Sequence, residues 1–191
     1  MIFRLFRRGP EARTIAALYG AIVAQARHPA FYLDFAVPDT PEGRFDMIVL
    51  HLVLACRRLG RAEGPDRASA QALSQDVFDM FCRDMDHNLR EMGVGDLSVP
   101  KKMQRMGEAF YGRLETYDRA LAADGDTELA AALARNVLGG QTPPAAAGRL
   151  AAYVRAAADR LDATPVADFE QGRLGFPDPA TIAAPACEAP A

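Results

Sequence analysis

The sequence contains neither a long apolar run nor an excess of positive charge, and both absences narrow its possible functions. Its longest apolar stretch, Met47 to Cys56, is interrupted by His51 and is about half as long as the roughly 20 residues that a transmembrane helix needs. The formal net charge of -3 argues against non-specific binding to nucleic acid, which requires a basic surface to displace counterions from phosphates. We therefore expect neither a membrane span nor a nucleic-acid partner.

Cysteines are few and do not form a recognisable site. Cys56, Cys82 and Cys187 are odd in number, and their spacing does not fit a metal site. We interpret them as reduced, buried thiols of a cytoplasmic protein. The amino terminus also lacks the apolar core of roughly 7–15 residues that a signal peptide needs, so we do not expect export.

Strand-like alternation of apolar and polar residues is missing, whereas apolar residues recur every three or four positions through most of the chain. This spacing predicts an all-α fold, a single compact domain of about six to seven helices. The expected helices run from Glu11 to Arg27, from Pro41 to Leu59, from Asp66 to about Met92, from Ser98 through Leu121, from Thr127 to Leu138 and from Pro143 to Asp162, with a short one after Thr164. Thr-Pro pairs at 40–41, 142–143 and 164–165 are typical of helix starts.

The helix over 41–59 is apolar on nearly every side, so we expect it to be the most buried helix, with His51 as a core histidine. The aromatic segment 28–39 has too many prolines for a central strand and is expected to be an extended, partly buried loop. Residues 10–173 then form the helical domain. Residues 174–191 are rich in proline and alanine and are expected to form a disordered tail.

Residues 1–9 form a short basic and aromatic segment before the first helix. Two interpretations stay open for it. It is either a foot on an anionic membrane surface or a frayed terminus before Pro10. In the first case the membrane contacts are Arg4, Phe6, Arg7 and Arg8.

The densest polar patch, residues 83–102, is expected to be a tight elbow between two helices. Gly93 and Gly95 allow positive φ where the first helix ends, Ser98 can cap the second, and Pro100 fits its first turn. An apolar stripe before the elbow is assigned to the core and consists of Phe78, Phe81, Cys82, Met85, Leu89 and Met92. On the opposite face, Asp86 and Arg90 are spaced for a helical ion pair.

Catalytic motifs are weak throughout the chain. A di-metal helix bundle needs two Glu-x-x-His pairs, and a helical prenyl-diphosphate enzyme needs aspartate clusters on two helices. The sequence offers one weak cluster, Asp84, Asp86 and His87. We expect no cofactor and no catalysis. The alternative is a helical-bundle enzyme with a metal or diphosphate site at these three residues.

Several segments resemble the ubiquinol-cytochrome c chaperone family, over roughly Leu18 to Arg119. They are Phe31-Tyr32, Val37-Pro38-Asp39-Thr40, Gly43-Arg44-Phe45-Asp46, Asp84-Met85-Asp86, Leu89 to Asp96, and Val99-Pro100-Lys101-Lys102-Met103. Mitochondrial members of that family help to assemble respiratory complex III by attending newly made cytochrome b, with a partner protein near the ribosome exit. This chain lacks a long presequence or anchor, which suggests a bacterial member.

The resemblance implies a non-catalytic chaperone that binds cytochrome b or its nascent chain, peripherally at the inner face of the cytoplasmic membrane. It also implies a small partner protein and the ribosome exit region as partners. The candidate partner-binding residues are Phe31, Tyr32, Asp39, Arg44, Asp84, Asp86, Arg90, Glu91, Gly93, Gly95, Asp96, Lys101 and Lys102.

Overall fold

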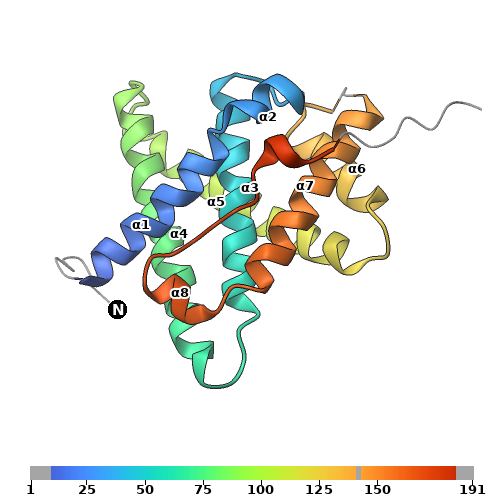
Figure 1. The fold of residues 1–191 in the computed structure, drawn as a ribbon. Helices are drawn as coiled ribbons and strands as arrows, with labels where there is room; N and C mark the ends of the chain where they lie inside the picture. The colour runs from blue at the N-terminus through green and yellow to red at the C-terminus, as the bar shows by residue number, and fades with distance from the viewer. Residues whose placement is uncertain (1–9, 141–142, 184–191) are drawn as a thin grey trace, which may run out of the picture.

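The computed structural model describes residues 10–140 and 143–183. These residues form eight α-helices and two short 3-10 helices, and they contain no strand, so the all-α prediction is confirmed (Figure 1). The helices are α1 (Pro10–Ala26), α2 (Pro29–Asp34), α3 (Pro41–Gly60), η1 (Gly64–Asp66), α4 (Arg67–Glu91), α5 (Val99–Ala122), α6 (Thr127–Asn136), α7 (Pro144–Asp162), α8 (Val166–Glu170) and η2 (Pro179–Thr181). The seven expected helices are all present, and α2 is an addition.

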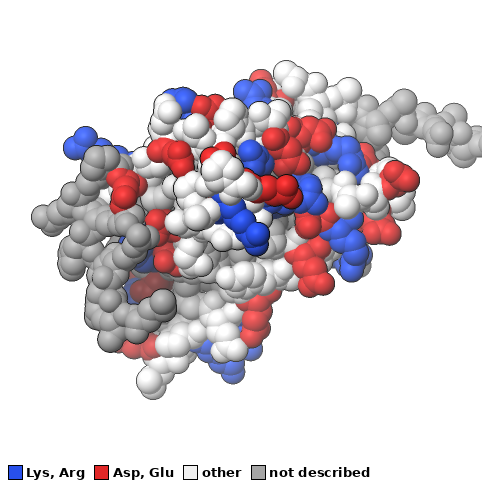
Figure 2. Space-filling view, turned by 90° about the horizontal axis from the view of Figure 1, so that it is seen from below, with Lys and Arg blue, Asp and Glu red and all other residues white. Residues whose placement is uncertain are grey.

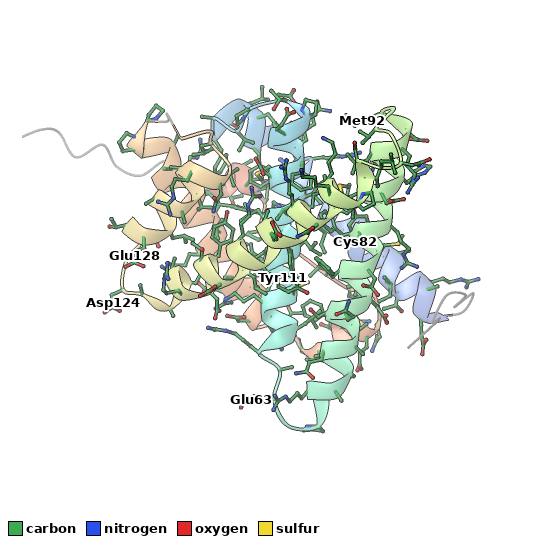
Figure 3. All side chains as sticks on the ribbon, turned by 180° about the vertical axis from the view of Figure 1, so that it is seen from behind. Glu63, Cys82, Met92, Tyr111, Asp124 and Glu128 are labelled. Carbon is green, nitrogen blue, oxygen red and sulfur yellow. The ribbon has the colours of Figure 1, made fainter. Side chains whose placement is uncertain are left out.

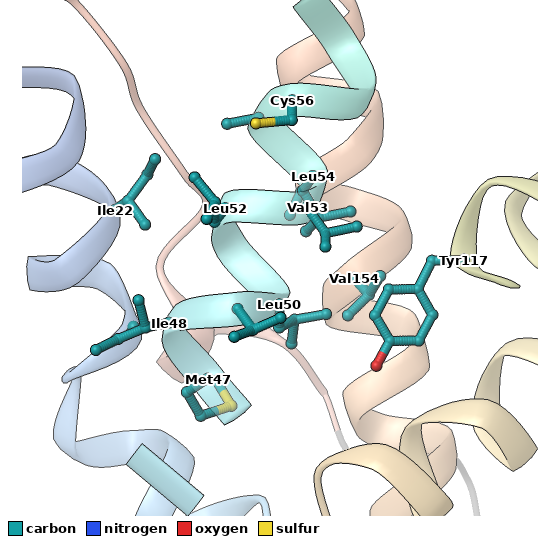
Figure 4. Packing of buried hydrophobic residues seen from close by; sticks show 14 of the residues in the cluster. Ile22, Met47, Ile48, Leu50, Leu52, Val53, Leu54, Cys56, Tyr117 and Val154 are labelled. Carbon is teal, nitrogen blue, oxygen red and sulfur yellow. The ribbon is translucent and has the colours of Figure 1, made fainter. Parts of the chain in front are cut away.

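Helix α3 lies at the centre of the molecule and is its most buried helix, as predicted. Every residue from Met47 to Arg57 is buried. The helix contacts α1, α4, α5 and α7, which surround it. In Figure 4, Ile22 of α1 lies on one side of α3, and Val154 of α7 and Tyr117 of α5 lie on the other. A helix that is apolar on all sides can be stable only when neighbours enclose it in this way.

The start of α3 shows how the sequence fixes a helix end. The Thr40 hydroxyl oxygen accepts a hydrogen bond from the backbone N–H of Gly43 at 3.1 Å, and Pro41 occupies the first turn. Gly43 has no alternative, because a Cβ there would lie 2.0 Å from the carbonyl oxygen of Pro38. The other residues that were expected to cap helices do not form this kind of hydrogen bond where the structure describes them. Asp66 and Ser98 make no side-chain capping bond, Thr164 donates to the Arg160 carbonyl instead, and Thr142 lies outside the described residues.

A buried arginine joins three helices. Arg57 of α3 is 6% exposed, and its Nε donates to Asp118 of α5 at 2.9 Å. Its Nη1 donates to Asp162 of α7 at 3.0 Å. Both carboxylates are only partly covered, and Asp118 also pairs with Arg61. The arrangement fixes the relative positions of α3, α5 and α7, because the buried guanidinium of Arg57 is paired with a carboxylate from each of the other two helices.

A second buried polar chain runs from α3 to α1. His51 Nδ1 lies 2.8 Å from the Met47 carbonyl oxygen, so this nitrogen carries the proton and Nε2 accepts from the Tyr153 hydroxyl, also at 2.8 Å. The Gln25 amide donates to the Tyr153 hydroxyl oxygen at 3.0 Å and to the Pro177 carbonyl at 2.9 Å. One tautomer satisfies every group, which confirms His51 as a hydrogen-bonded core histidine.

The expectation of an extended loop over 28–39 was wrong for its first half, which is α2. His28 Nδ1 accepts from the backbone N–H of Ala30 at 3.3 Å, and Pro29 provides the first turn, so this side chain caps a helix too short to show periodicity. After α2, the chain reverses its direction in a tight turn. Ala36 has a φ of 57°, and the Val37 N–H donates to the Phe31 carbonyl.

The carboxyl-terminal segment is also more structured than expected. Residues 174–183 were assigned to a disordered tail, but Leu174, Phe176 and Ile182 pack against the core. The Phe176 ring lies 5.0 Å from the His51 ring, edge to face. The aromatic and aliphatic side chains of this segment therefore bury enough surface to hold it across α3 (Figure 1). Residues 184–191, with Cys187, lie outside the described residues. Of the other cysteines, Cys56 is buried as expected and Cys82 only partly.

The surface matches the low net charge. On the face seen in Figure 2, Lys and Arg side chains are interspersed with Asp and Glu, so no field of one sign covers it. Within residues 10–140 and 143–183, none of the helices combines the length and hydropathy that crossing a bilayer requires.

Shortening Leu52 tests the central position of α3. Leu52 is 0% exposed, so Leu52→Ala should lower the free energy of unfolding by about 2–5 kcal/mol. Leu33→Ala is the matched control, because Leu33 is 80% exposed and its truncation removes little packing. Chemical denaturation measures both. Equal stability of Leu52→Ala and the parent would contradict the assignment of α3 to the core.

The buried imidazole predicts an acid-side loss of stability. Burial lowers the pKa of His51 from 6.5 to about 4, so the unfolded chain binds a proton between these values that the folded chain does not. Stability should fall as the pH falls from 6.5 to 4, by about 3 kcal/mol from this group. Denaturation at a series of pH values measures it. His51→Gln should remove this component of the slope, whereas His87→Gln, at an exposed position, should keep it.

Candidate partner-binding surface

The elbow between α4 and α5 is built by a glycine-terminated helix end. Gly93 has a φ of 78°, its N–H donates to the Arg90 carbonyl, and the Val94 N–H donates to the Leu89 carbonyl. This pair of bonds is a Schellman motif, which uses glycine because other residues are strained at that φ. Gly93 therefore does what the sequence predicted. Gly95 does not adopt a positive φ, and its carbonyl instead accepts from Ser98 N–H, which turns the chain into α5.

Arg90 forms ion pairs with two carboxylates of the elbow. Its guanidinium pairs with Asp86 one turn earlier, at 2.7 Å, and with Asp96 across the turn. The hydrogen bond from Arg90 lowers the pKa of Asp86, and Asp86 in turn raises the pKa of Arg90. His87 and Glu91 form a separate exposed pair at 3.1 Å. These side chains face water, so their contribution is mainly to the shape and charge of the elbow.

Asp84, another candidate, is half-buried and forms a hydrogen bond inside the fold. One of its carboxylate oxygens accepts from the buried Tyr19 hydroxyl of α1 at 2.7 Å. Burial, and then this hydrogen bond, raise the pKa of Tyr19 well above its usual value, so the phenol stays protonated and remains a donor. The bond ties α4 to α1 immediately below the elbow.

The three residues of the alternative enzyme site do not converge. Asp84 bonds to Tyr19, Asp86 pairs with Arg90, and His87 pairs with Glu91. Among the described residues, no three His, Cys, Asp or Glu side chains are arranged to hold a metal ion. The geometry gives this site no support.

Two large apolar side chains are exposed at the elbow. Met92 is 72% exposed and Leu97 98% exposed, and Figure 3 shows Met92 at the tip of the α4–α5 pair. The assignment of Met92 to the core stripe was wrong, because Met92 is the residue that follows α4 and its side chain is exposed at the elbow. Sequence reasoning did not single out Leu97. The available signal was a leucine inside a polar turn, beyond the end of any helical stripe.

Lys101 and Lys102 complete this surface on the first turn of α5. They are the two lysines of the whole chain, all other basic side chains besides histidine being arginines. Both are exposed, and neither has a salt-bridge partner among the described residues. We name Met92, Leu97, Lys101 and Lys102, with the Asp86–Arg90–Asp96 cluster, the elbow surface.

The remaining candidates lie around α2 and the start of α3. Phe31 is fully buried against Phe35, His51 and Tyr153, so its role in this structure is packing. The hydroxyl of the half-buried Tyr32 donates to the Ala26 carbonyl at 2.8 Å.

Asp39 and Arg44 form an exposed ion pair at 2.7 Å, in which the arginine lowers the pKa of Asp39. This corner and the elbow lie toward the same end of the molecule, uppermost in Figures 1 and 3. The membrane-contact candidates Arg4, Phe6, Arg7 and Arg8 lie outside the described residues.

Comparisons with known proteins agree with this architecture. A solved structure described as the Cbp3 homolog from Brucella abortus superimposes with a TM-score of 0.82 at 39% identity, covering 96% of this chain and all of that one. The Ubiquinol-cytochrome-c reductase complex assembly factor 1 of Xenopus laevis is 32% identical over 151 residues, which are 78% of this chain and 73% of the frog protein. The factor of the same name from Drosophila melanogaster is 27% identical over 155 residues, 80% of this chain and 59% of the fly protein.

The family described as Ubiquinol-cytochrome C chaperone matches residues 33–176. The match includes α3, the elbow, the buried Arg57 cluster and the first residues, 174–176, of the segment that crosses α3. The chain belongs to the ubiquinol-cytochrome c chaperone family.

Proposed function

We propose that this protein is a non-catalytic assembly factor for respiratory complex III and that its client is cytochrome b. The family match over residues 33–176 carries the proposal. It is supported by the frog relative, whose name states a role in assembly of the ubiquinol-cytochrome c reductase complex. The client, a small partner protein and the ribosome exit region are taken from the family resemblance. The proposed place of action is the inner face of the cytoplasmic membrane, where cytochrome b is inserted.

The elbow surface is the proposed docking site for the client. Met92 and Leu97 expose apolar area to water in one turn, and such area is typically retained where a partner covers it. The neighbouring Asp86, Arg90 and Asp96 side chains are already paired with one another. A partner can therefore bind beside them without burying a charge that lacks an ion-pair partner. Lys101 and Lys102 remain available for charged groups of the partner.

The pairing of the catalytic candidates favours a non-catalytic role. The strongest catalytic candidates, Asp84, Asp86 and His87, are each engaged in a different pair. Metal analysis of the purified protein tests the alternative. Stoichiometric zinc, iron or manganese that is lost in Asp84→Asn would favour an enzyme over a chaperone.

Making the exposed apolar pair polar should separate binding from folding. Met92→Ser with Leu97→Ser removes side chains that make little internal contact, so the melting temperature should stay within a few degrees of the parent. Cytochrome b recovered with the tagged protein from membranes should fall several-fold. Leu33→Ser, at an exposed leucine of α2, is the control. Undiminished recovery with the elbow variant, or an equal loss with Leu33→Ser, would exclude the elbow as the specific site.

Reversing the two lysines tests their charge. Lys101→Glu with Lys102→Glu should leave stability intact, because acidic residues are favourable near a helix N-terminus. Like charges in a specific interface cost several kcal/mol, so assembled complex III should fall in cells that keep normal amounts of the variant. Lys101→Arg with Lys102→Arg keeps the charge and should keep complex III. Loss of the variant protein itself would point to a role of the lysines in folding.

The scarcity of lysine provides a direct test of contact. An amine-reactive cross-linker can attach this chain only at Lys101, Lys102 and the terminal amine. Cross-links to cytochrome b should therefore form in membranes with the parent and disappear with Lys101→Arg, Lys102→Arg. Cross-links that persist in the arginine variant would place the client near the amino terminus instead.

A further inference from the structure

A groove of about 280 Å³ opens beside the start of α1, where α1, α4 and α8 meet. Its floor includes Ile15, which is 8% exposed, and the half-buried Leu73. Its rim carries the carboxylates of Glu11, Asp76 and Glu170. The groove is thus apolar below and acidic above, and the functions proposed above do not use it.

The walls of this groove are held together by close contacts. The Thr14 hydroxyl of α1 donates to the Glu170 carbonyl of α8 at 3.3 Å. The chain leaving α8 approaches α1 so closely that a Cβ at Gly172 would lie 3.1 Å from the Ala17 side chain, and Gly172 also has a φ of 73°. Asp76 and Glu170 have no ion-pair partner among the described residues, so both carboxylates can accept a cationic group from outside that set.

The residues that precede α1 have the complementary composition. Residues 1–9, which lie outside the described part, contain Ile2, Phe3, Leu5 and Phe6 interspersed with Arg4, Arg7 and Arg8. They continue directly into Pro10, next to the groove residue Glu11. Nine extended residues reach up to about 30 Å, whereas Glu11 and Ile15 line the groove within two turns of the helix start, so the segment is long enough to fold back.

We propose that residues 1–9 bind this groove in the same molecule, with apolar side chains on Ile15 and Leu73 and arginines on Asp76 and Glu170. Covalent attachment gives the segment a high effective concentration, which favours this occupant over a free partner of similar chemistry. The acidic rim excludes an anionic bilayer from the groove itself. A segment bound there is withheld from the membrane, so the groove controls whether Arg4, Phe6, Arg7 and Arg8 are available as membrane contacts.

The experiment uses the absence of tryptophan from the chain. Phe6→Trp introduces a single indole, and its emission in the full-length protein without lipid should be blue-shifted relative to free tryptophan. Asp76→Asn with Glu170→Gln in that background should move the emission back to the position of a water-exposed indole. The control pair is Asp124→Asn with Glu128→Gln, two exposed acids at the far side of the molecule from α1 (Figure 3), and should leave it blue-shifted.

Two further measurements keep the test decisive if the groove variant is less stable than the parent. Raising the salt concentration of the unmodified reporter protein should red-shift its emission, because salt screens exposed ion pairs. Deleting residues 1–9 should increase hydrogen exchange in the α4 segment that contains Leu73 and Asp76.

Three outcomes would overturn the proposal. The first is a water-like emission in the reporter protein without lipid, or an unchanged emission in the groove variant. The second is a blue shift that grows with protein concentration, which would identify a second copy as the occupant. The third is a blue shift that appears only with phosphatidylglycerol vesicles, which would make the segment a membrane contact alone.

Discussion

Enclosure of α3 is the constraint from which the rest of the fold follows. Because residues 47–57 are buried without interruption, the helix has no face that can remain in water. Four helices must therefore contact it, and each of these needs only one apolar stripe. The polar groups that are nevertheless carried by α3 are satisfied individually. Arg57 reaches two carboxylates, and His51 reaches a carbonyl and a phenol.

The same constraint explains the elbow. Helices α4 and α5 have 25 and 24 residues and are longer than the 20-residue α3 that they cover. Their junction lies at the edge of the molecule, where Met92 marks the tip of the pair in Figure 3. Residues at this end, such as Met92 and Leu97, keep apolar side chains without an internal neighbour. The nearby hydrogen bond from Tyr19 to Asp84 still holds α4 to α1.

Periodicity was sufficient for every long helix, because one apolar residue per turn over four or more turns leaves a clear pattern. It was insufficient for α2, whose six residues depend on the His28 cap, and for Met92, where the stripe continues in the sequence after the core has ended. The prediction of disorder for residues 174–183 was wrong because it rested on their proline and alanine content, which does not show whether individual side chains pack against the core. Phe176 packs on His51, and Leu174 and Ile182 also pack against the core. The candidate site was predictable in location from its glycines and charges, but its exposed apolar residues required knowledge of where α1 and α3 end.

An assembly factor needs a surface that a partner can cover, whereas an enzyme needs reactive groups inside a cavity. A catalytic site needs titratable groups held in one cavity with displaced pKa values, whereas here the displaced groups are structural. Tyr19 and His51 are shifted chiefly by burial, and each is fully hydrogen-bonded inside the fold. On the surface, Met92 and Leu97 expose apolar area at the elbow, and the carboxylates of Asp76 and Glu170 beside α1 have no ion-pair partner among the described residues. In our proposals a second surface covers each feature: the client at the elbow and the amino-terminal segment at the groove. The groups with displaced pKa values therefore hold the fold together, and the features assigned to partner binding lie apart from them on the surface.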